Sequence, residues 1–265
     1  MTLKSSKKDK GEDALFISQK DFGVFDGVGG WRSSGVDSGE YSRHLAAAVA
    51  DNLRTQREEK SATDIKVSTA LDYGALSCAK SRLTGSSTAC IASLNDTLGV
   101  LTVLNLGDSG IIVCRKTENG IRIIFKAVMT THSFNFPFQI GNIGDPKYGK
   151  MLSDTSSDAI IENVQLKDGD ISVMGTDGLW DNLFDEDIVS ILSRSKIFEK
   201  AASDRVESDL QPLLSEISTL TLKKASNTKE RTPWSVGVEK HYKERYTGGK
   251  PDDVSIILSS FSNKR

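Results

Sequence analysis

Acidic residues stand at the ends of short apolar segments at four places in this chain, and that pattern constrains its fold more than any other feature. They are Glu12 and Asp13 before the run 14–17, Asp26 after 22–25, Asp177 after 171–176, and Asp252 and Asp253 before 254–258. Runs of this kind are typical of β-strands with turn residues at their ends. One Asp before a Gly is an ordinary turn signal. Strands that gather in a sheet or sandwich, however, would bring three or more of these carboxylates together.

Carboxylates that converge repel one another strongly unless a cation lies between them. No cluster of Arg or His lies near these acids in the sequence. Oxygen ligands favour Mg²⁺ or Mn²⁺, whereas zinc prefers His and Cys, and the three histidines here are scattered. Gly27 also leaves its carbonyl open to a cation. The residues alone therefore predict metal-dependent hydrolysis, and they favour a phosphoester as the substrate.

The hydrophobic periodicity changes along the chain and predicts an α+β fold. Strands are expected at 14–18 and 22–26 as a hairpin, at 88–94, 98–106, 111–115 and 121–126 as one antiparallel meander, and at 160–165, 171–174 and 254–258. Helices are expected at 39–57, after a cap at Asp64, and at 186–193 and 206–222, with irregular segments at 130–158 and 226–250. The prediction is a basic tail over 1–10 followed by a single domain over 11–262.

Composition excludes several classes of protein. The net charge is −2 over 265 residues, which argues against nucleic acid as a partner, and no run of about 18 apolar residues predicts a membrane span. Cys78, Cys90 and Cys114 form neither a disulfide framework nor a Cys-x₅-Arg motif, which excludes a thiol phosphatase. Reduced cysteines predict an intracellular compartment, with cytoplasm, nucleus and mitochondrion all open. The spacing of Gly144–Lys150 fits a nucleotide-binding loop, but Met151 stands where Ser or Thr is needed.

Six short motifs, in order, resemble the metal-dependent Ser/Thr protein phosphatases of type 2C. They are Gly11–Ala14, Phe25–Gly30, Gly85–Ala89, Leu106–Ser109, Gly175–Asp181 and Pro251–Val254. Three further segments, Gly27–Arg32, Phe134–Gln139 and Gly248–Asp253, resemble a branch that includes mitochondrial-type members. The resemblance implies a four-layer α/β/β/α sandwich of two antiparallel sheets flanked by helices.

The same resemblance implies a site with two Mn²⁺ or Mg²⁺ ions. Asp26 would bridge both ions, the Gly27 carbonyl would bind one, and Asp177 and Asp252 would bind the other. Glu12 and Asp13 would act through metal-bound waters. A hydroxide bridging the ions would attack phosphoserine or phosphothreonine in a protein substrate. Asp108 is expected to be a turn acid and not a ligand.

Three departures from the family pattern keep an alternative open. Val28 stands where the family often has a His that protonates the leaving alcohol. Lys8, with Lys10 nearby, stands where many members have a phosphate-binding Arg, and Lys cannot form the bidentate fork. Thr131 precedes His132 where many members have an Asp for a third metal. The alternative is a weak or inactive pseudophosphatase that acts as a binding module; the sequence leaves the oligomeric state open.

Overall fold

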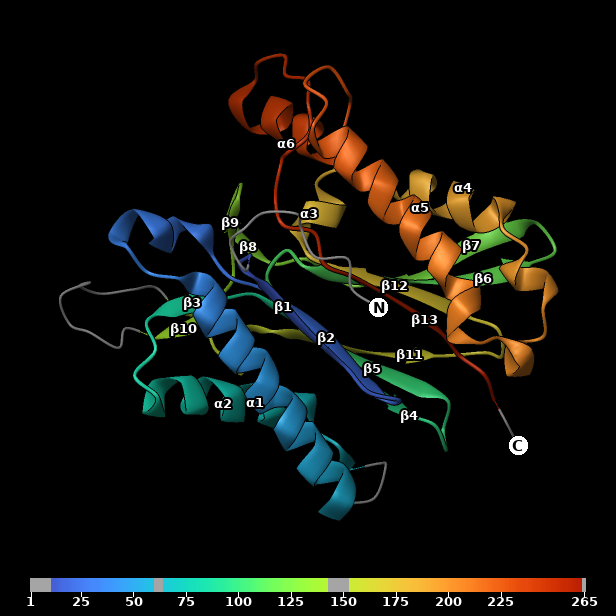
Figure 1. Cartoon of the computed structure of the whole chain (residues 1–265), viewed down its shortest axis with the longest axis horizontal. Helices are drawn as coiled ribbons and strands as arrows, with labels where there is room; N and C mark the ends of the chain where they lie inside the picture. Colours follow the sequence, from blue (N-terminus) through green and yellow to red (C-terminus); the bar gives the residue numbers. More distant parts are fainter. Residues whose placement is uncertain (1–10, 60–63, 143–152, 264–265) are drawn as a thin grey trace. The chain divides into compact units, whose positions relative to one another are not determined.

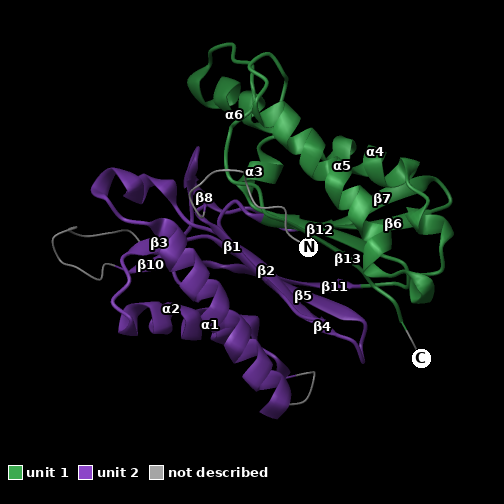
Figure 2. Cartoon of the chain, in the orientation of Figure 1, with its two compact units in different colours: residues 1–5, 110–126, 166–265 green, residues 6–109, 127–165 purple. Residues whose placement is uncertain are grey.

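The computed structural model describes residues 11–59, 64–142 and 153–263 (Figure 1). These residues form two compact units (Figure 2). Unit 1 comprises 110–126 and the described residues from 166 onward, and unit 2 comprises the described residues before 110 together with 127–165. Each unit is built around its own antiparallel sheet. No helix in the described part of the chain combines the length and the apolar character needed to cross a bilayer.

Unit 2 contains a five-stranded sheet in the order β1-β2-β4-β5-β11. Its strands are β1 (Asp13–Ile17), β2 (Asp21–Asp26), β4 (Ala89–Asn95), β5 (Val100–Leu106) and β11 (Ile160–Gln165). Helices α1 (Ser38–Glu59) and α2 (Val67–Lys80) pack on each other, and α1 also contacts β1 and β2. Apolar residues spaced three and four apart on α1 face this core. The core includes Tyr41, Leu45 and Val49 of α1, Leu71 of α2, and Phe25, Ile91 and Leu104 of the sheet.

Short elements complete unit 2. The strand β3 (Gly85–Ser87) pairs with β10 (Ile140–Asn142), and β8 (Thr131–Ser133) pairs with β9 (Phe136–Pro137). Two 3₁₀ turns, η1 (Gly29–Ser34) and η4 (Ser156–Asp158), follow β2 and precede β11. The segment expected to be irregular over 130–158 thus contains three short strands and one turn in its described part.

Unit 1 contains a four-stranded sheet in the order β13-β12-β6-β7. Its strands are β6 (Gly110–Thr117), β7 (Gly120–Lys126), β12 (Ile171–Gly175) and β13 (Ile256–Ser260). Its helices are α3 (Asp177–Trp180), α4 (Asp185–Arg194), α5 (Glu207–Ala225) and α6 (Pro233–Tyr242), with 3₁₀ turns η5 (Ile197–Glu199) and η6 (Ala202–Asp204). Helix α5 contacts β13 and α4 contacts β7, so both pack on this sheet.

The predicted α+β class, with two antiparallel sheets flanked by helices, is confirmed. Each unit contains one antiparallel sheet with helices that contact it. The domain boundary predicted for 11–262 remains a prediction.

The predicted four-stranded meander is wrong. Strand β4 pairs with β5 in one sheet, and β6 pairs with β7 in the other. The turn 107–109 separates them: Gly107 adopts a φ of +106°, and its backbone N–H donates to Thr130 Oγ1 at 2.9 Å. This backbone conformation favours glycine and redirects the chain after β5. Periodicity locates strands, but it does not say which strands pair.

Two helix boundaries also differ from expectation. Helix α2 begins at Val67 after Lys66, so Asp64 does not cap it. Helix α6 lies inside the predicted loop 226–250, and its N-terminus carries a recognisable signal. Thr232 Oγ1 accepts a hydrogen bond of 3.1 Å from the Ser235 N–H, and Pro233 occupies the first helical position.

Candidate metal centre

Three of the predicted acidic residues lie at one end of the β1–β2 hairpin. The register of the two strands places Asp13 opposite Asp26. The Gly27 N–H donates a hydrogen bond of 3.1 Å to the Glu12 carbonyl, which extends the pairing by one residue. Glu12, Asp13 and Asp26 therefore lie at the same end of the hairpin.

The backbone of Asp26 is held by the segment after β3. The Asp26 N–H donates to Thr88 Oγ1 at 3.2 Å, and the Thr88 N–H donates to the Asp26 carbonyl at 2.9 Å. Thr88 Oγ1 in turn lies 2.9 Å from Ser109 Oγ, and the hydroxyl groups of both residues are buried. The motifs 85–89 and 106–109 thus act on the site by fixing where Asp26 stands.

The carboxylate of Glu12 lies against the turn η1. Ser38 Oγ donates to Glu12 Oε1 at 3.2 Å, and Arg32 Nη2 lies 3.3 Å from the same oxygen. A Cβ at Gly29 would stand 3.0 Å from Glu12 Oε2, so the turn packs closely on this carboxylate. Val28 joins β2 to η1; its N–H donates to the Ser86 carbonyl at 3.0 Å, and its side chain carries no titratable group.

Asp177 and Asp252 are brought together within unit 1. Asp177 is the first residue of α3, and Thr176 alone separates it from β12. The Thr176 N–H donates to the Ser255 carbonyl at 3.2 Å, and the Ser255 N–H donates to Thr176 Oγ1 at 3.2 Å. A Cβ at Gly178 would stand 2.0 Å from the Asp253 carbonyl oxygen. Only glycine therefore allows the segment that leads into β13 to pass so close to Asp177.

A lysine lies among the acids of unit 1, and sequence analysis missed it. Lys250 Nζ contacts Asp177 Oδ2 and lies 3.0 Å from Asp181 Oδ2 and 3.3 Å from Asp252 Oδ2. The sequence places no cluster of Arg or His near these acids; in unit 1 their basic partner is a lysine. Asp181 was not among the candidate residues either, although it ends the motif 175–181.

The pKa values of this group reflect its burial and its crowding. Burial is the main cause that raises the pKa of Asp181 to about 7, and the neighbouring Asp177 adds to it. Burial followed by the charge of Asp177 raises the pKa of Asp252. For Lys250, burial opposes the charged form, but the three carboxylates outweigh it and raise the pKa above its ordinary value.

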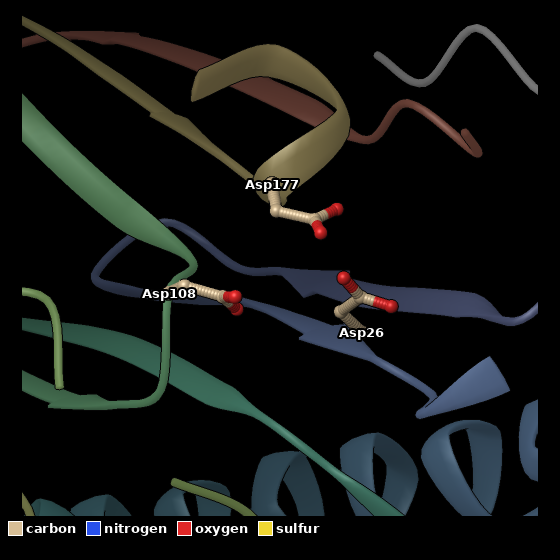
Figure 3. Close-up of side chains that lie close together, drawn as sticks. All are labelled: Asp26, Asp108 and Asp177. Atoms are coloured by element: carbon tan, nitrogen blue, oxygen red, sulfur yellow. The ribbon is translucent and has the colours of Figure 1, made fainter. Parts of the chain in front are cut away.

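Among the described residues, Asp26, Asp108 and Asp177 form a group of carboxylates that could hold a metal ion. One carboxylate oxygen from each lies within 4.8 Å of the other two (Figure 3). Asp26 ends β2, Asp108 lies in the turn after β5, and Asp177 begins α3. Asp108 was expected to be a turn acid only, but its carboxylate belongs to this group. Asp252 does not; its carboxylate contacts Lys250.

The donor set fits Mg²⁺ or Mn²⁺. Oδ1 of Asp177 is buried and has no hydrogen-bond partner among the described residues. A buried carboxylate oxygen of this kind is costly unless a cation or a donor satisfies it. The three-acid group contains no His or Cys, so its ligands are all oxygen, which favours these hard ions over zinc.

Several predicted or discussed residues play no visible part in this arrangement. Lys8, Lys10 and the loop-like motif Gly144–Lys150 lie outside the described residues. His132 Nε2 lies 3.0 Å from Asp154 Oδ2, and its ring stacks on Phe138 with centroids 4.1 Å apart. His132 is therefore held within unit 2 by an acid and an aromatic ring.

Comparisons with known proteins agree with one another. The family model described as "Protein phosphatase 2C" matches residues 3–136. The chain is similar to the protein phosphatase PTC7 homolog fig of Drosophila melanogaster, with 32% identity over 94% of this chain and 77% of that protein. It is similar to probable protein phosphatase 2C 55 of Arabidopsis thaliana, with 35% identity over 94% of this chain and 48% of that protein.

Solved structures share this fold. The photosystem II phosphatase PBCP matches with a TM-score of 0.71 and 26% identity over 96% of this chain and 93% of that one. The catalytic domain of the serine/threonine phosphatase PstP matches with a TM-score of 0.60 and 15% identity, over 99% of this chain and 96% of that one. At 15% identity the second match speaks for the fold alone.

Proposed function

Because this chain belongs to the protein phosphatase 2C family and is a metal-dependent Ser/Thr protein phosphatase, we propose that Asp26, Gly27, Asp177 and Asp252 hold its two catalytic ions. The grouping of Asp26 and Asp177 with Asp108 is the observation that carries the assignment of those two residues, and it adds Asp108 to the ligands expected from the sequence. Gly27 directly follows Asp26, and Asp252 shares the contact of Asp177 with Lys250. The PstP catalytic domain, which shares the fold, was solved in complex with two manganese ions. For this chain, the all-oxygen donor set of the three acids supports Mn²⁺ or Mg²⁺ as the cofactor.

Two such ions, when bound, activate the attacking water and offset charge on the phosphoryl oxygens of the substrate. The chain supplies the frame for that chemistry. Thr88 fixes the backbone of Asp26, and Gly178 lets the Asp252 segment approach Asp177. Rigid placement matters because a displacement of about 1 Å at reacting atoms costs roughly a hundredfold in rate.

Glu12 and Asp13 are proposed to orient water at the edge of the site. Both lie beside Asp26 at the end of the hairpin, and Glu12 is itself positioned by Ser38 and Arg32. Carboxylates one step removed from a metal orient its ligands and waters in this way. Lys8 and Lys10 remain the proposed phosphate-binding residues.

Val28 offers no proton for the leaving alcohol, so this step differs from members of the family with a His there. The alternative of an inactive binding module is not favoured, because the chain keeps a buried carboxylate oxygen of Asp177 without a donor. Such an atom is a cost to folding that a non-catalytic binding module would have no reason to keep.

The substrates are phosphoproteins, as the family implies. We also propose that the enzyme acts inside the cell, since Cys78, Cys90 and Cys114 are free and buried. Free cysteines persist in reducing compartments.

The direct test is phosphate release from phosphoserine and phosphothreonine peptides by the purified chain. We expect turnover with Mn²⁺ or Mg²⁺, loss of turnover in EDTA, and recovery when Mn²⁺ is added back. Asp26→Asn should remove activity while circular dichroism and thermal unfolding show a folded protein. A folded wild-type chain that is idle with either metal would overturn the proposal and favour the binding module.

A further inference from the structure

The ammonium group of Lys250 is enclosed by three carboxylates and an aromatic ring. It contacts Asp177, lies 3.0 Å from Asp181 Oδ2 and 3.3 Å from Asp252 Oδ2, and stands 5.2 Å from the centroid of Trp234. Its side chain is only 17% exposed. A lysine ammonium group is strongly hydrated in water. In this site the carboxylates take the place of that water, and the fold holds the ammonium group among them.

A buried asparagine fixes the backbone of Lys250 on both sides. The Lys250 N–H donates to Asn182 Oδ1 at 2.9 Å, and Asn182 Nδ2 donates to the Lys250 carbonyl at 2.9 Å. The same Nδ2 also donates to the Gly178 carbonyl at 2.9 Å, one residue after Asp177. Asn182 therefore ties the backbone of Lys250 to the turn that carries Asp177.

The two residues before Lys250 leave little freedom to the segment. Gly248 adopts a φ of +121°, and its carbonyl accepts a hydrogen bond of 2.8 Å from Thr232 Oγ1. A Cβ at Gly249 would stand 2.2 Å from the Lys224 carbonyl oxygen. Glycines at both positions thus allow the chain to enter the site along one path and deliver the Lys250 side chain to the acids.

We propose that Lys250 is a built-in cation that holds the acids of unit 1 together and competes with the metal ion for Asp177. The inference rests on the proposed function, because it treats Asp177 and Asp252 as metal ligands. Lys250 is a positioning residue here: it acts through the carboxylates that bind the ion, and it sets the affinity of the site.

Two opposite effects follow from this placement. The ammonium group holds three crowded carboxylates at close range, which stabilises the site before an ion arrives. It also repels the ion and occupies Oδ2 of Asp177. Even at the dielectric constant of water, a unit charge about 4 Å from a divalent ion weakens binding by more than tenfold. Repulsion therefore outweighs the gain from positioning, and removal of the charge should tighten metal binding.

The test is calorimetric titration of the full chain with Mn²⁺, in the wild type and in Lys250→Met. We expect Lys250→Met to bind Mn²⁺ about tenfold more tightly. The matched control is Lys224→Met: Lys224 is 13% exposed, lies 2.8 Å from Asp187 Oδ2, and stands 5.8 Å from the ring of Phe184. The control removes a similar buried pair from the same unit, and we expect it to leave Mn²⁺ affinity unchanged.

Thermal unfolding without metal gives a second measurement. In EDTA the melting temperature of Lys250→Met should lie several degrees below that of the wild type, because its acids lack a counter-charge. Added Mn²⁺ should raise the melting temperature of Lys250→Met more than that of the wild type. Lys250→Arg keeps the charge and should bind Mn²⁺ as the wild type does. A variant that folds only when Mn²⁺ is present also supports the proposal.

Four results would count against it. Unchanged or weaker Mn²⁺ binding in Lys250→Met overturns the role of Lys250, and so does failure to fold even at saturating Mn²⁺. Equal tightening in Lys224→Met would show a general effect of lost charge. A wild-type chain that binds no Mn²⁺ at all overturns the proposed function itself, which separates the two failures.

Discussion

The indole N–H of Trp31 donates a hydrogen bond of 2.7 Å to Oγ of Ser86. Ser86 Oγ in turn donates to Gln139 Oε1 at 2.6 Å, and both Ser86 and Gln139 are buried. The backbone of Ser86 also accepts from the Val28 N–H. The turn that follows Asp26 and Gly27 is therefore anchored at two points on the β3 segment, and its position depends on that anchor.

Trp31→Phe should weaken this anchor while keeping an aromatic ring in place. We expect a loss of about 1 kcal/mol in the free energy of unfolding, the usual net worth of one hydrogen bond. Mn²⁺ affinity should fall a few-fold because the Gly27 carbonyl is held less firmly. Urea unfolding and Mn²⁺ titration measure the two effects. Ser33→Ala is the control, since Ser33 Oγ makes only an exposed bond within the same turn, and equal losses in both variants would contradict the anchor.

Gly27 and Gly30 offer a matched pair within one turn. A Cβ at Gly27 would stand 2.7 Å from the carbonyl oxygens of Glu12 and Ser38, whereas a Cβ at Gly30 would meet nothing within 4 Å. Gly27→Ala should cost about 1–3 kcal/mol in stability, as overpacking does, and should lower activity sharply. Gly30→Ala should stay within about 0.5 kcal/mol of the wild type. Similar melting temperatures for the two variants would show that Gly27 is not tightly enclosed.

Asp108 can serve as a turn acid or as a metal ligand, and a substitution at this residue distinguishes the two roles. If its carboxylate binds an ion together with Asp26 and Asp177, Asp108→Asn should lower Mn²⁺ affinity at least tenfold with little change in melting temperature in EDTA. Asp51→Asn is a suitable control, because Asp51 lies exposed on α1 and pairs only weakly with Arg54. Wild-type Mn²⁺ affinity in Asp108→Asn would return this residue to the role of a turn acid.

The position of the three acids at the end of the β1–β2 hairpin in unit 2 could be predicted from the sequence. Glu12, Asp13 and Asp26 flank two short apolar runs joined by three residues, so hairpin pairing alone brings their ends together. The motif 85–89 was recognised as part of the family pattern. Two hydrogen bonds join Thr88 of this motif to the backbone of Asp26. Only the structure shows them, because the two residues are 62 positions apart in the sequence.

The lysine in unit 1 could not be predicted in the same way. Lys250 meets Asp177 across 73 positions, and only the packing of the 248–250 segment against Asn182 and α5 brings them together. The polar composition of 226–250 predicts a loop, although Thr232 and Pro233 inside it are a helix-start signal. Strand pairing is hard to predict from the sequence for a similar reason, since the turn at Gly107 decides which sheet the chain joins next.

The three cysteines give a pH-dependent prediction. Burial raises the pKa of Cys78 to about 11 and that of Cys114 to about 12, and it raises the pKa of Cys90 as well. Unfolded thiols ionise near pH 9, so a raised folded pKa contributes stability that is fully present below that pH. This stability is lost as the pH rises from about 9 toward 11, because the unfolded state then releases protons that the folded state keeps.

Two measurements check this prediction. The native protein should leave all three thiols unreacted with Ellman's reagent at pH 8, and guanidinium should expose all three, since each side chain is buried. The urea midpoint should fall between pH 8 and pH 10.5, and it should fall less steeply in Cys90→Ala, which removes one buried thiol from β4. The wild type and Cys90→Ala carry the same lysines and tyrosines, which titrate in the same pH range. The difference between their two slopes therefore reports the effect of the Cys90 thiol. Parallel slopes for the two proteins, or rapid native labelling, would mean that these thiols reach solvent in the folded chain.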